Sequence, residues 1–211
     1  MSTIASQVAN KLLEIKAIKL QPNNPFTWAS GLKSPIYCDN RILLSYPKIR
    51  NFIKDALVNK TLAFPKFDVI AGVATAGIPH GALLADALDK PFIYVRSKAK
   101  SHGRQNMIEG ELNEGAKVLV IEDLISTGKS SVAAVDALLE SGAEVIGVLA
   151  IFTYGFQTAR DVFSERQISM DTLTNYRNLL QEALDTSYIT DEQKSLLESW
   201  NQDPVKWAEQ F

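Results

Sequence analysis

Residues 68–154 alternate regularly between apolar runs and segments of helical character. Segments of helical character at 77–88 and 130–142 lie among four apolar runs, which are DVIAGV (68–73), PFIYV (91–95), KVLVIED (117–123) and EVIGVLAIFTY (144–154). Apolar runs without polar alternation are typical of strands buried on both faces, which pair in parallel and are covered by the connecting helices. The pattern therefore predicts an α/β fold with a central, mostly parallel sheet flanked by helices.

The flanking regions carry shorter signals. Val8, Leu12, Ile15 and Ile18 have helical spacing, so we expect a helix over about 2–18. We also expect two short strands around a turn within 26–41, and a helix that starts at Ser45 and Pro47 and ends at about Leu62. The tail (157–211) is expected to be helical, with one short strand near 168–170 and a capping box in TDEQ (190–193). A chain of 211 residues fits a single domain, 1–211.

Composition excludes several classes of protein. The formal net charge is −2, so a basic nucleic-acid-binding surface is not expected. Cys38 is the one cysteine, and with only His80 and His102 beside it a zinc site is not expected either. The longest apolar run, 145–152, is far shorter than the ~20 residues that span a bilayer, and residues 1–20 lack a signal-peptide core. These features predict a cytoplasmic protein without membrane or nucleic-acid partners.

In parallel sheets the ligand site lies at the carboxyl ends of the strands. The segments that follow 73, 95, 123 and 153 are therefore the candidate site. GVATAGIPHG (72–81) opens a helix, and its small residues would let the backbone approach an anion; a tight turn without a ligand is the alternative. RSKAKSHGRQN (96–106) is basic without an acid, which indicates either a functional lid or a solvated loop.

The stretch VLVIEDLISTGKSS (118–131) carries the strongest signal. It is not a nucleotide-binding P-loop, because Asp123 stands where that motif requires glycine, and Lys129 is then an exposed first-turn residue. Hydroxyl and backbone N–H groups of residues 126–131 form a cup for a phosphate monoester, and two adjacent carboxylates suit a vicinal diol. The alternative is that the acids only cap the following helix.

These segments resemble a known family. VLVIEDLISTGKSS resembles the phosphoribosyl pyrophosphate (PRPP) motif of type I phosphoribosyltransferases. FTWASGLKSPIYCDNR (26–41) resembles the N-terminal substrate stretch of the orotate phosphoribosyltransferases, and YVRSKAKSHG (94–103) resembles their mobile catalytic loop. The segments keep the order and approximate spacing of the family over about 20–155.

The resemblance implies the type I phosphoribosyltransferase fold, with a small N-terminal hood at about 20–45 and a mobile loop at about 96–116. It implies a Mg²⁺-dependent reaction in which orotate displaces pyrophosphate from PRPP to give orotidine 5′-monophosphate for UMP synthesis. Magnesium would be held mainly through PRPP. Members are homodimers in which the mobile loop serves the site of the neighbouring subunit.

The site residues follow by position in the motifs. Glu122 and Asp123 would bind the ribose hydroxyls, while Arg96, Lys100 and His102 would act on the pyrophosphate as the catalytic residues. Tyr37, Lys33 and Ser126 would bind orotate. The 5′-phosphate would lie in a segment that we call the phosphate loop, residues 124–130, formed by Leu124, Ile125, Ser126, Thr127, Gly128, Lys129 and Ser130.

The chain departs from the family pattern at four positions. Ser97 follows Arg96 where some members have a second basic residue. Ala29 and Ala76 stand where many members have lysine, and Thr153 stands where some carry an arginine for orotate. Two other functions remain open. A phosphoribosyltransferase for a purine base would share the PRPP motif, but residues 26–41 argue against it. A PRPP-binding regulator would be expected to carry a DNA-binding domain and a basic face, which the acidic pI of about 5.8 disfavours.

Overall fold

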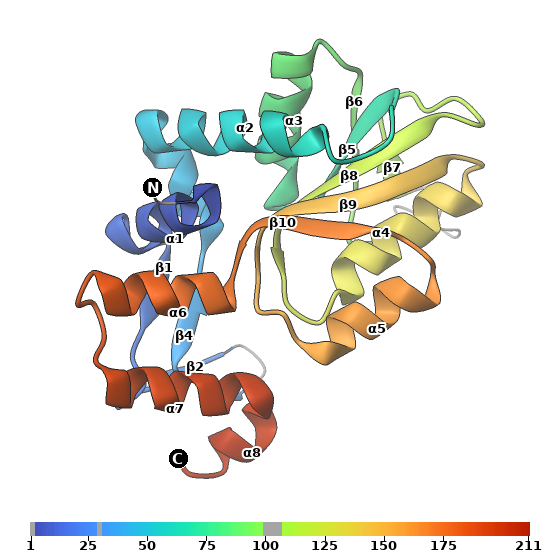
Figure 1. Ribbon diagram of the computed structural model, residues 1–211. Coiled ribbons are helices and arrows are strands. Elements are labelled where there is room, and N and C mark those ends of the chain that lie inside the picture. The colour runs from blue at the N-terminus through green and yellow to red at the C-terminus, as the bar shows by residue number, and fades with distance from the viewer. Residues whose placement is uncertain (1–2, 29–30, 99–106) are drawn as a thin grey trace. The chain divides into compact units, whose positions relative to one another are not determined.

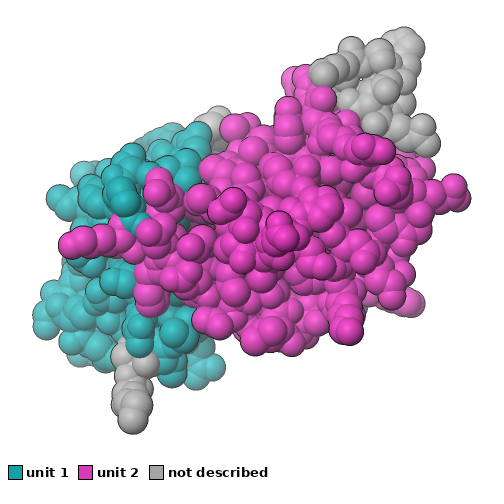
Figure 2. All heavy atoms as spheres, turned by 90° about the horizontal axis from the view of Figure 1, so that it is seen from above, with its two compact units in different colours: residues 1–47, 174–211 teal, residues 48–173 magenta. Residues whose placement is uncertain are grey.

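The computed structural model describes residues 3–28, 31–98 and 107–211. The chain forms two compact units (Figure 2). Unit 1 combines residues 1–47 with residues 174–211, so it is built from both ends of the chain. Unit 2 is the continuous segment 48–173, which contains the alternating strands and helices.

Unit 2 is organised around a six-stranded sheet with the strand order β10-β9-β8-β5-β6-β7 (Figure 1). β6, β5, β8 and β9 are parallel neighbours, whereas β7 pairs with β6 in the antiparallel direction. This arrangement confirms the predicted α/β fold. The elements are α2 (Pro47–Thr61), β5 (Val69–Val73), α3 (Gly77–Leu88), β6 (Phe92–Val95), β7 (Ile108–Glu109), β8 (Lys117–Ile125), α4 (Lys129–Glu140), β9 (Glu144–Thr153), α5 (Gln157–Glu165) and β10 (Met170–Asn175), the first and last of which extend across the boundary with unit 1.

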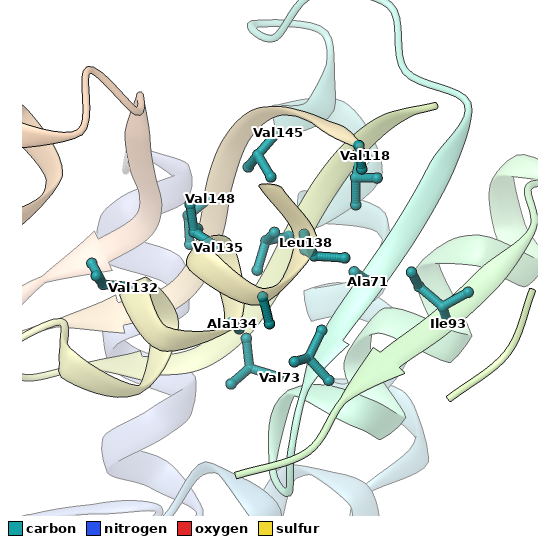
Figure 3. Close-up of a cluster of buried hydrophobic side chains, with 14 of the residues drawn as sticks. Ala71, Val73, Ile93, Val118, Val132, Ala134, Val135, Leu138, Val145 and Val148 are labelled. Atoms are coloured by element: carbon teal, nitrogen blue, oxygen red, sulfur yellow. The ribbon is translucent and has the colours of Figure 1, made fainter. Parts of the chain in front are cut away.

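The apolar core of unit 2 lies between α4 and one face of the sheet. Val132, Val135 and Leu138 of α4 are buried against strand residues such as Val118 and Val148 (Figure 3). The helical spacing of these α4 residues places them on one side of the helix, as expected for a helix that covers a sheet. The core therefore fixes where the N-terminus of α4 lies relative to the end of β8.

α3 covers the opposite face of the sheet (Figure 1) and packs unusually close to it. A Cβ atom at Gly77 would lie 2.5 Å from the Ile121 carbonyl oxygen, and one at Gly72 would lie 2.9 Å from the Ile78 Cα. A Cβ at Gly81 would lie 2.8 Å from the Phe92 ring. The glycines of 72–81 therefore allow α3 to pack closely against the sheet. The sequence suggested only that they would let a ligand approach the backbone, and this packing was not predicted.

Three strands of unit 2 differ from expectation. β7 was not predicted, since two residues are too few to show a period. β8 continues past Asp123 to Ile125, because Leu124 and Ile125 pair with Phe152 and Thr153 of β9. β10 begins at Met170 and is longer than the strand expected near 168–170.

Unit 1 contains α1 (Ile4–Glu14), β1 (Ile18–Leu20), β2 (Phe26–Thr27), β3 (Lys33–Ser34), β4 (Ile36–Cys38), the 3₁₀ helix η1 (Asn40–Ser45), α6 (Tyr176–Asp185), α7 (Asp191–Gln202) and α8 (Pro204–Ala208). β2 pairs with β3 as expected, and β1 pairs with β4 in a second antiparallel ladder that was not predicted. α1 ends earlier than predicted, because Lys16 adopts a left-handed conformation (φ 57°) and Ile18 enters β1.

The C-terminal helices confirm one further expectation. The predicted capping box is present at the start of α7: the Thr190 hydroxyl accepts from the Gln193 N–H, and the Gln193 side chain accepts from the Thr190 N–H. Trp200 is fully buried and contacts the rings of Trp28 and Tyr176. Among the described residues, no helix combines the length and apolar character needed to cross a membrane.

Candidate active site

The phosphate loop connects the end of β8 to the start of α4. Ile125 still belongs to the strand, where its carbonyl oxygen accepts hydrogen bonds from the Thr153 hydroxyl (2.9 Å) and the Tyr154 N–H (3.2 Å). The chain then turns at residues 126–128 and enters α4 at Lys129. The strand end and the helix start are therefore held together within three residues.

Gly128 makes this turn possible. It is the N-cap residue of α4 and has a φ of +80°, a left-handed conformation that side chains rarely adopt. A Cβ atom here would also lie 3.0 Å from Val162 Cγ2 and 3.2 Å from Phe163 Cε2 of α5. Glycine is required both by the backbone and by the packing of α5 beneath the turn.

The first turn of α4 is suited to an anion. Its first N–H groups have no intrahelical partner, and the glycine N-cap has no side chain that could accept from them. Thr127, Lys129 and Ser130 are exposed around this helix end and Ser126 is half-buried. The exposure of Lys129 confirms its prediction as an exposed first-turn residue. These are the groups that were expected to form a cup for a phosphate monoester, and that role stays a prediction.

Ser131 does not belong to this cup. Its hydroxyl was expected to join those of the cup, but the side chain is fully buried and donates to Glu122 Oε2 (3.3 Å). The reason is helical phase: Ser131 precedes Val135 by four residues and Leu138 by seven, so it lies on the stripe that faces the sheet. That spacing is present in the sequence and could have been used to predict that Ser131 is buried.

The two acids have different surroundings. Both acids were expected to face water or ligand where the strand leaves the sheet, but β8 continues to Ile125 and Glu122 is only 5% exposed. Its carboxylate accepts from the Asp123 N–H (3.1 Å) and the Ser130 hydroxyl (3.4 Å), in addition to Ser131. Burial, followed by the neighbouring Asp123 charge, raises the pKa of Glu122 well above its ordinary value.

Asp123 is half-buried at the same strand end. Its carboxyl group interacts with that of Glu122, because a side-chain hydrogen bond to Asp123 is among the causes of the raised Glu122 pKa. The start of α3 adjoins this strand end, because a Cβ atom at Gly77 would lie 3.3 Å from the Glu122 Cα. Ala76, the N-cap of α3, likewise provides no side-chain cap. A second helix N-terminus therefore opens near the acid pair.

Arg96 directly follows β6. Its backbone N–H donates to the Met107 carbonyl (2.8 Å), and its guanidinium lies 3.4 Å from the Glu109 carboxylate of β7. Both side chains are partly exposed, so the pair is screened by solvent and leaves Arg96 available to an anion. Lys98 is exposed. The predicted catalytic residues Lys100 and His102 lie outside the described residues, as does Ala29.

At the end of β9, the Thr153 side chain forms hydrogen bonds with the backbone of the protein. Its side chain is buried, donates to the Ile125 carbonyl and accepts from the Gly155 N–H (3.0 Å). Thr153 therefore braces the end of β8.

The predicted orotate residues Lys33 and Tyr37 belong to unit 1. The Lys33 ammonium donates to the Thr27 hydroxyl (3.0 Å) across the β2–β3 pair. Tyr37 is 39% exposed, its ring lies 5.7 Å from that of Phe26, and Lys19 lies 6.0 Å from the ring centroid. An exposed aromatic face with cations nearby suits a flat, negatively charged ring.

Comparison with known proteins agrees with this geometry. A family model of the phosphoribosyl transferase domain matches residues 40–186. The chain therefore belongs to the phosphoribosyltransferase family.

Individual relatives show which group within the family the chain belongs to. The orotate phosphoribosyltransferase of Phocaeicola vulgatus is 56% identical over 208 residues, which are 98% of each chain. The crystal structure of the orotate phosphoribosyltransferase from Aeropyrum pernix is 26% identical with a TM-score of 0.75, over 87% of this chain and 99% of that one. The structure of Leishmania donovani UMP synthase is 28% identical with a TM-score of 0.79; the match covers 93% of this chain but only 42% of that protein. Within the family, the chain is a member of the orotate phosphoribosyltransferases, and it is an enzyme.

Proposed function

We propose that this enzyme transfers the ribose 5-phosphate group of PRPP to orotate, giving orotidine 5′-monophosphate and pyrophosphate in de novo pyrimidine synthesis. The observation that carries the proposal is the junction of β8 and α4. An acid at the strand end and an uncapped helix N-terminus five to six residues later provide partners for a ribose diol and for its 5′-phosphate. The names of the similar relatives support orotate as the acceptor.

The phosphate loop binds the 5′-phosphate and so fixes the ribose. This contact is the same in the ground state and the transition state, and it therefore contributes mainly to PRPP affinity. Breaking the C1–O bond builds positive charge on the ribose and negative charge on pyrophosphate. The Arg96 guanidinium, together with Lys100 and His102 as predicted from the motif, stabilises the departing pyrophosphate where this charge develops.

Magnesium is part of the proposal. Among the described residues, no three His, Cys, Asp or Glu side chains gather in a way that could hold a metal ion. Mg²⁺ often keeps several waters and binds through substrate phosphates, so the oxygens of PRPP would carry it to this site. The half-buried Asp123 carboxylate at the strand end is compatible with such a cation nearby. Bound there, magnesium would neutralise charge on the leaving pyrophosphate.

Orotate would be held by Lys33, Tyr37 and Ser126. A lysine ammonium and a hydroxyl can pair with the carboxylate and ring oxygens of orotate, while an exposed tyrosine ring offers it a stacking surface. A homodimer whose loop 96–116 reaches the neighbouring site is proposed from the family resemblance. The cytoplasmic location stays a prediction from the sequence.

The direct test is the loss of orotate absorbance on addition of enzyme, Mg²⁺ and PRPP, with PRPP omitted as the control. Consumption of orotate only when PRPP is present is the expected result. Faster turnover of hypoxanthine or adenine would show that the base assignment is wrong. PRPP binding without turnover of any base would instead favour a regulator that keeps the fold.

A further inference from the structure

The C-terminal helices of unit 1 carry a buried tryptophan that the proposed reaction does not use. Trp200 of α7 is fully buried, and its ring meets the Trp28 ring edge-on, with the centroids 5.9 Å apart and an interplanar angle of 86°. This edge-to-face arrangement is a preferred geometry of aromatic pairs. Trp28 directly follows β2, so the contact joins the C-terminal end of the chain to the segment that carries the predicted orotate residues.

Trp28 closes the turn between β2 and β3. Its backbone N–H donates to the Leu32 carbonyl (2.9 Å), and its carbonyl accepts from the Gly31 N–H (2.8 Å). Its indole N–H donates to the Ile36 carbonyl (3.1 Å), which also accepts from the buried Ser34 hydroxyl (3.0 Å). Trp28 is therefore bonded both to the turn and to the first residue of β4.

These hydrogen bonds end next to the two unit 1 side chains that are proposed to hold orotate. Lys33 directly follows Leu32, and Tyr37 directly follows Ile36. A shift of Trp28 would therefore move both side chains together with the backbone that carries them. The position of the Trp28 ring thus affects the orotate site, although Trp28 is not among the residues proposed to bind orotate.

The packing around Trp200 limits where the Trp28 ring can lie. The Trp200 ring also contacts the ring of Tyr176 in α6 at 5.4 Å, and the Tyr176 hydroxyl donates to the Leu197 carbonyl of α7 (3.0 Å). The next helix, α8, lies against β3. Closely packed interiors transmit displacements, because their side chains have few voids to move into. A change at Trp200 should therefore be felt at Trp28.

We infer that Trp200 is a positioning residue for orotate, which holds Trp28 and through it the backbone beside Lys33 and Tyr37. Helices α7 and α8 then support the base-binding segment in addition to completing the fold of unit 1. The inference rests on the proposed function, because it concerns how orotate is held. The phosphate loop belongs to unit 2, so we expect an effect on orotate that PRPP does not share.

Replacement of Trp200 tests the inference in steady-state kinetics. Trp200→Leu removes the aromatic ring and keeps an apolar side chain. It should raise the KM for orotate by about threefold to tenfold, the range expected for the loss of one edge-to-face contact. The KM for PRPP and the kcat at saturating orotate should change by less than about twofold. Trp200→Phe keeps an aromatic ring, so its KM for orotate should lie closer to that of the wild type.

Trp28→Phe tests the other side of the contact and is the milder substitution. It keeps a ring against Trp200 and removes the indole N–H that donates to the Ile36 carbonyl. One lost hydrogen bond should raise the KM for orotate by about fivefold, while the KM for PRPP stays that of the wild type. If Trp200→Leu does not fold, Trp28→Phe and Trp200→Phe decide the question.

Tyr176→Phe is the matched control. It removes the hydroxyl that donates to the Leu197 carbonyl and keeps an aromatic ring against Trp200. Denaturant unfolding should show that this variant is less stable than the wild type, because a buried hydrogen bond is lost. Both of its KM values should nevertheless remain those of the wild type. The control therefore separates a general loss of stability from an effect on the position of Trp28.

Each contrary outcome is specific. A Trp200→Leu protein that is less stable but keeps the wild-type KM for orotate would overturn the inference, and so would equal rises in the KM for orotate and for PRPP. An unchanged KM for orotate in Trp28→Phe would overturn it as well, as would a rise in Tyr176→Phe that matches the one in Trp200→Leu. A wild-type protein that does not consume orotate in the presence of PRPP would instead show that the proposed function is wrong.

Discussion

The Thr153 hydroxyl donates to the carbonyl oxygen of Ile125, 2.9 Å away, where β9 and β8 end side by side. This carbonyl belongs to the same planar peptide group as the Ser126 N–H, which points in the opposite direction. Thr153, together with the Tyr154 N–H that donates to the same carbonyl, therefore sets the direction in which the first N–H group of the turn faces. Its role is to orient the phosphate loop from the neighbouring strand.

Replacing Thr153 tests this contact. Thr153→Val keeps the shape of the side chain and removes the hydroxyl, which also leaves the Gly155 N–H without its acceptor. We expect a loss of about 1 kcal/mol in unfolding free energy and a several-fold rise in the KM for PRPP. Thr153→Ser is the matched control: it loses a buried methyl group but keeps the hydroxyl, so its KM should remain that of the wild type. Equal KM values for the valine and serine variants would contradict the orienting role.

Gly128 provides a second test of the phosphate loop. Gly128→Ala forces a Cβ atom into a left-handed conformation and against Val162 and Phe163, so α4 or α5 must shift. Gly115→Ala is the control, because Gly115 has a similar φ of +75° but open space around it. Both variants should lose about 1–2 kcal/mol from backbone strain. Only Gly128→Ala should lose further stability and raise the KM for PRPP, as measured by denaturant unfolding and steady-state kinetics.

Asp123→Asn keeps the size of the side chain and removes its charge. If Asp123 binds the ribose diol, kcat/KM for PRPP should fall by on the order of 10²-fold, which corresponds to a charged hydrogen bond of roughly 2–3 kcal/mol. Asp86→Asn, at an exposed position of α3, is the control and should leave kcat/KM unchanged. An unchanged value for Asp123→Asn would mean that this acid is structural.

The sequence predicted the elements of unit 2 well because their signals are local. The apolar runs that form β5, β6, β8 and β9 exclude most other folds, and the turn that contains Gly128 marks the start of α4. Where β8 ends could not be predicted, since the pairing of Leu124 and Ile125 with β9 depends on a partner about 28 residues away. The small ladders β1–β4 and β6–β7 were missed for the same reason.

The sequence was sufficient to identify residues of the candidate site, but not the role of each one. The motif placed Glu122, Asp123 and Ser131 together, and the structure brings them to one strand end. What separates Glu122 from Asp123 is burial under α4, which depends on how the helix packs. The burial of Ser131 could have been predicted from its four-residue spacing from Val135. The resemblance to a phosphate-binding motif instead suggested that its hydroxyl binds the ligand.

The raised pKa of Glu122 leads to a pH dependence of stability. In the unfolded chain Glu122 titrates near its ordinary value of 4.5, whereas burial and the Asp123 charge raise the pKa in the folded protein. Between the two values the folded state binds more protons, so Glu122 lowers stability progressively as the pH rises from about 4.5 through the raised pKa. Glu122→Gln should therefore gain unfolding free energy relative to the wild type as the pH increases over this window.

Denaturant unfolding of both proteins at a series of pH values measures this difference. Glu111→Gln, at an exposed position, is the control and should track the wild type. A difference between Glu122→Gln and the wild type that stays constant from acidic to neutral pH would contradict the raised pKa.

Lys100 is the subject of the last prediction, which depends on the sequence motif because this residue lies outside the described residues. Charge stabilisation confined to the transition state lowers kcat when it is removed, while ground-state binding suffers less. Lys100→Ala should lower kcat by roughly 10²–10³-fold and leave PRPP binding within about tenfold. Lys66→Ala, at an exposed position far along the chain, is the matched control and should retain full kcat.

Mixed dimers then show which site the loop serves. If the loop crosses the dimer, a Lys100→Ala subunit paired with an Asp123→Ala subunit carries both lesions in one site and neither in the other. Up to about half of the wild-type activity per dimer should then return, although each parent variant is inactive, since independent sites contribute additively. Mixed dimers that are verified by mass and remain inactive would mean that the loop serves its own subunit or that the two sites do not work independently.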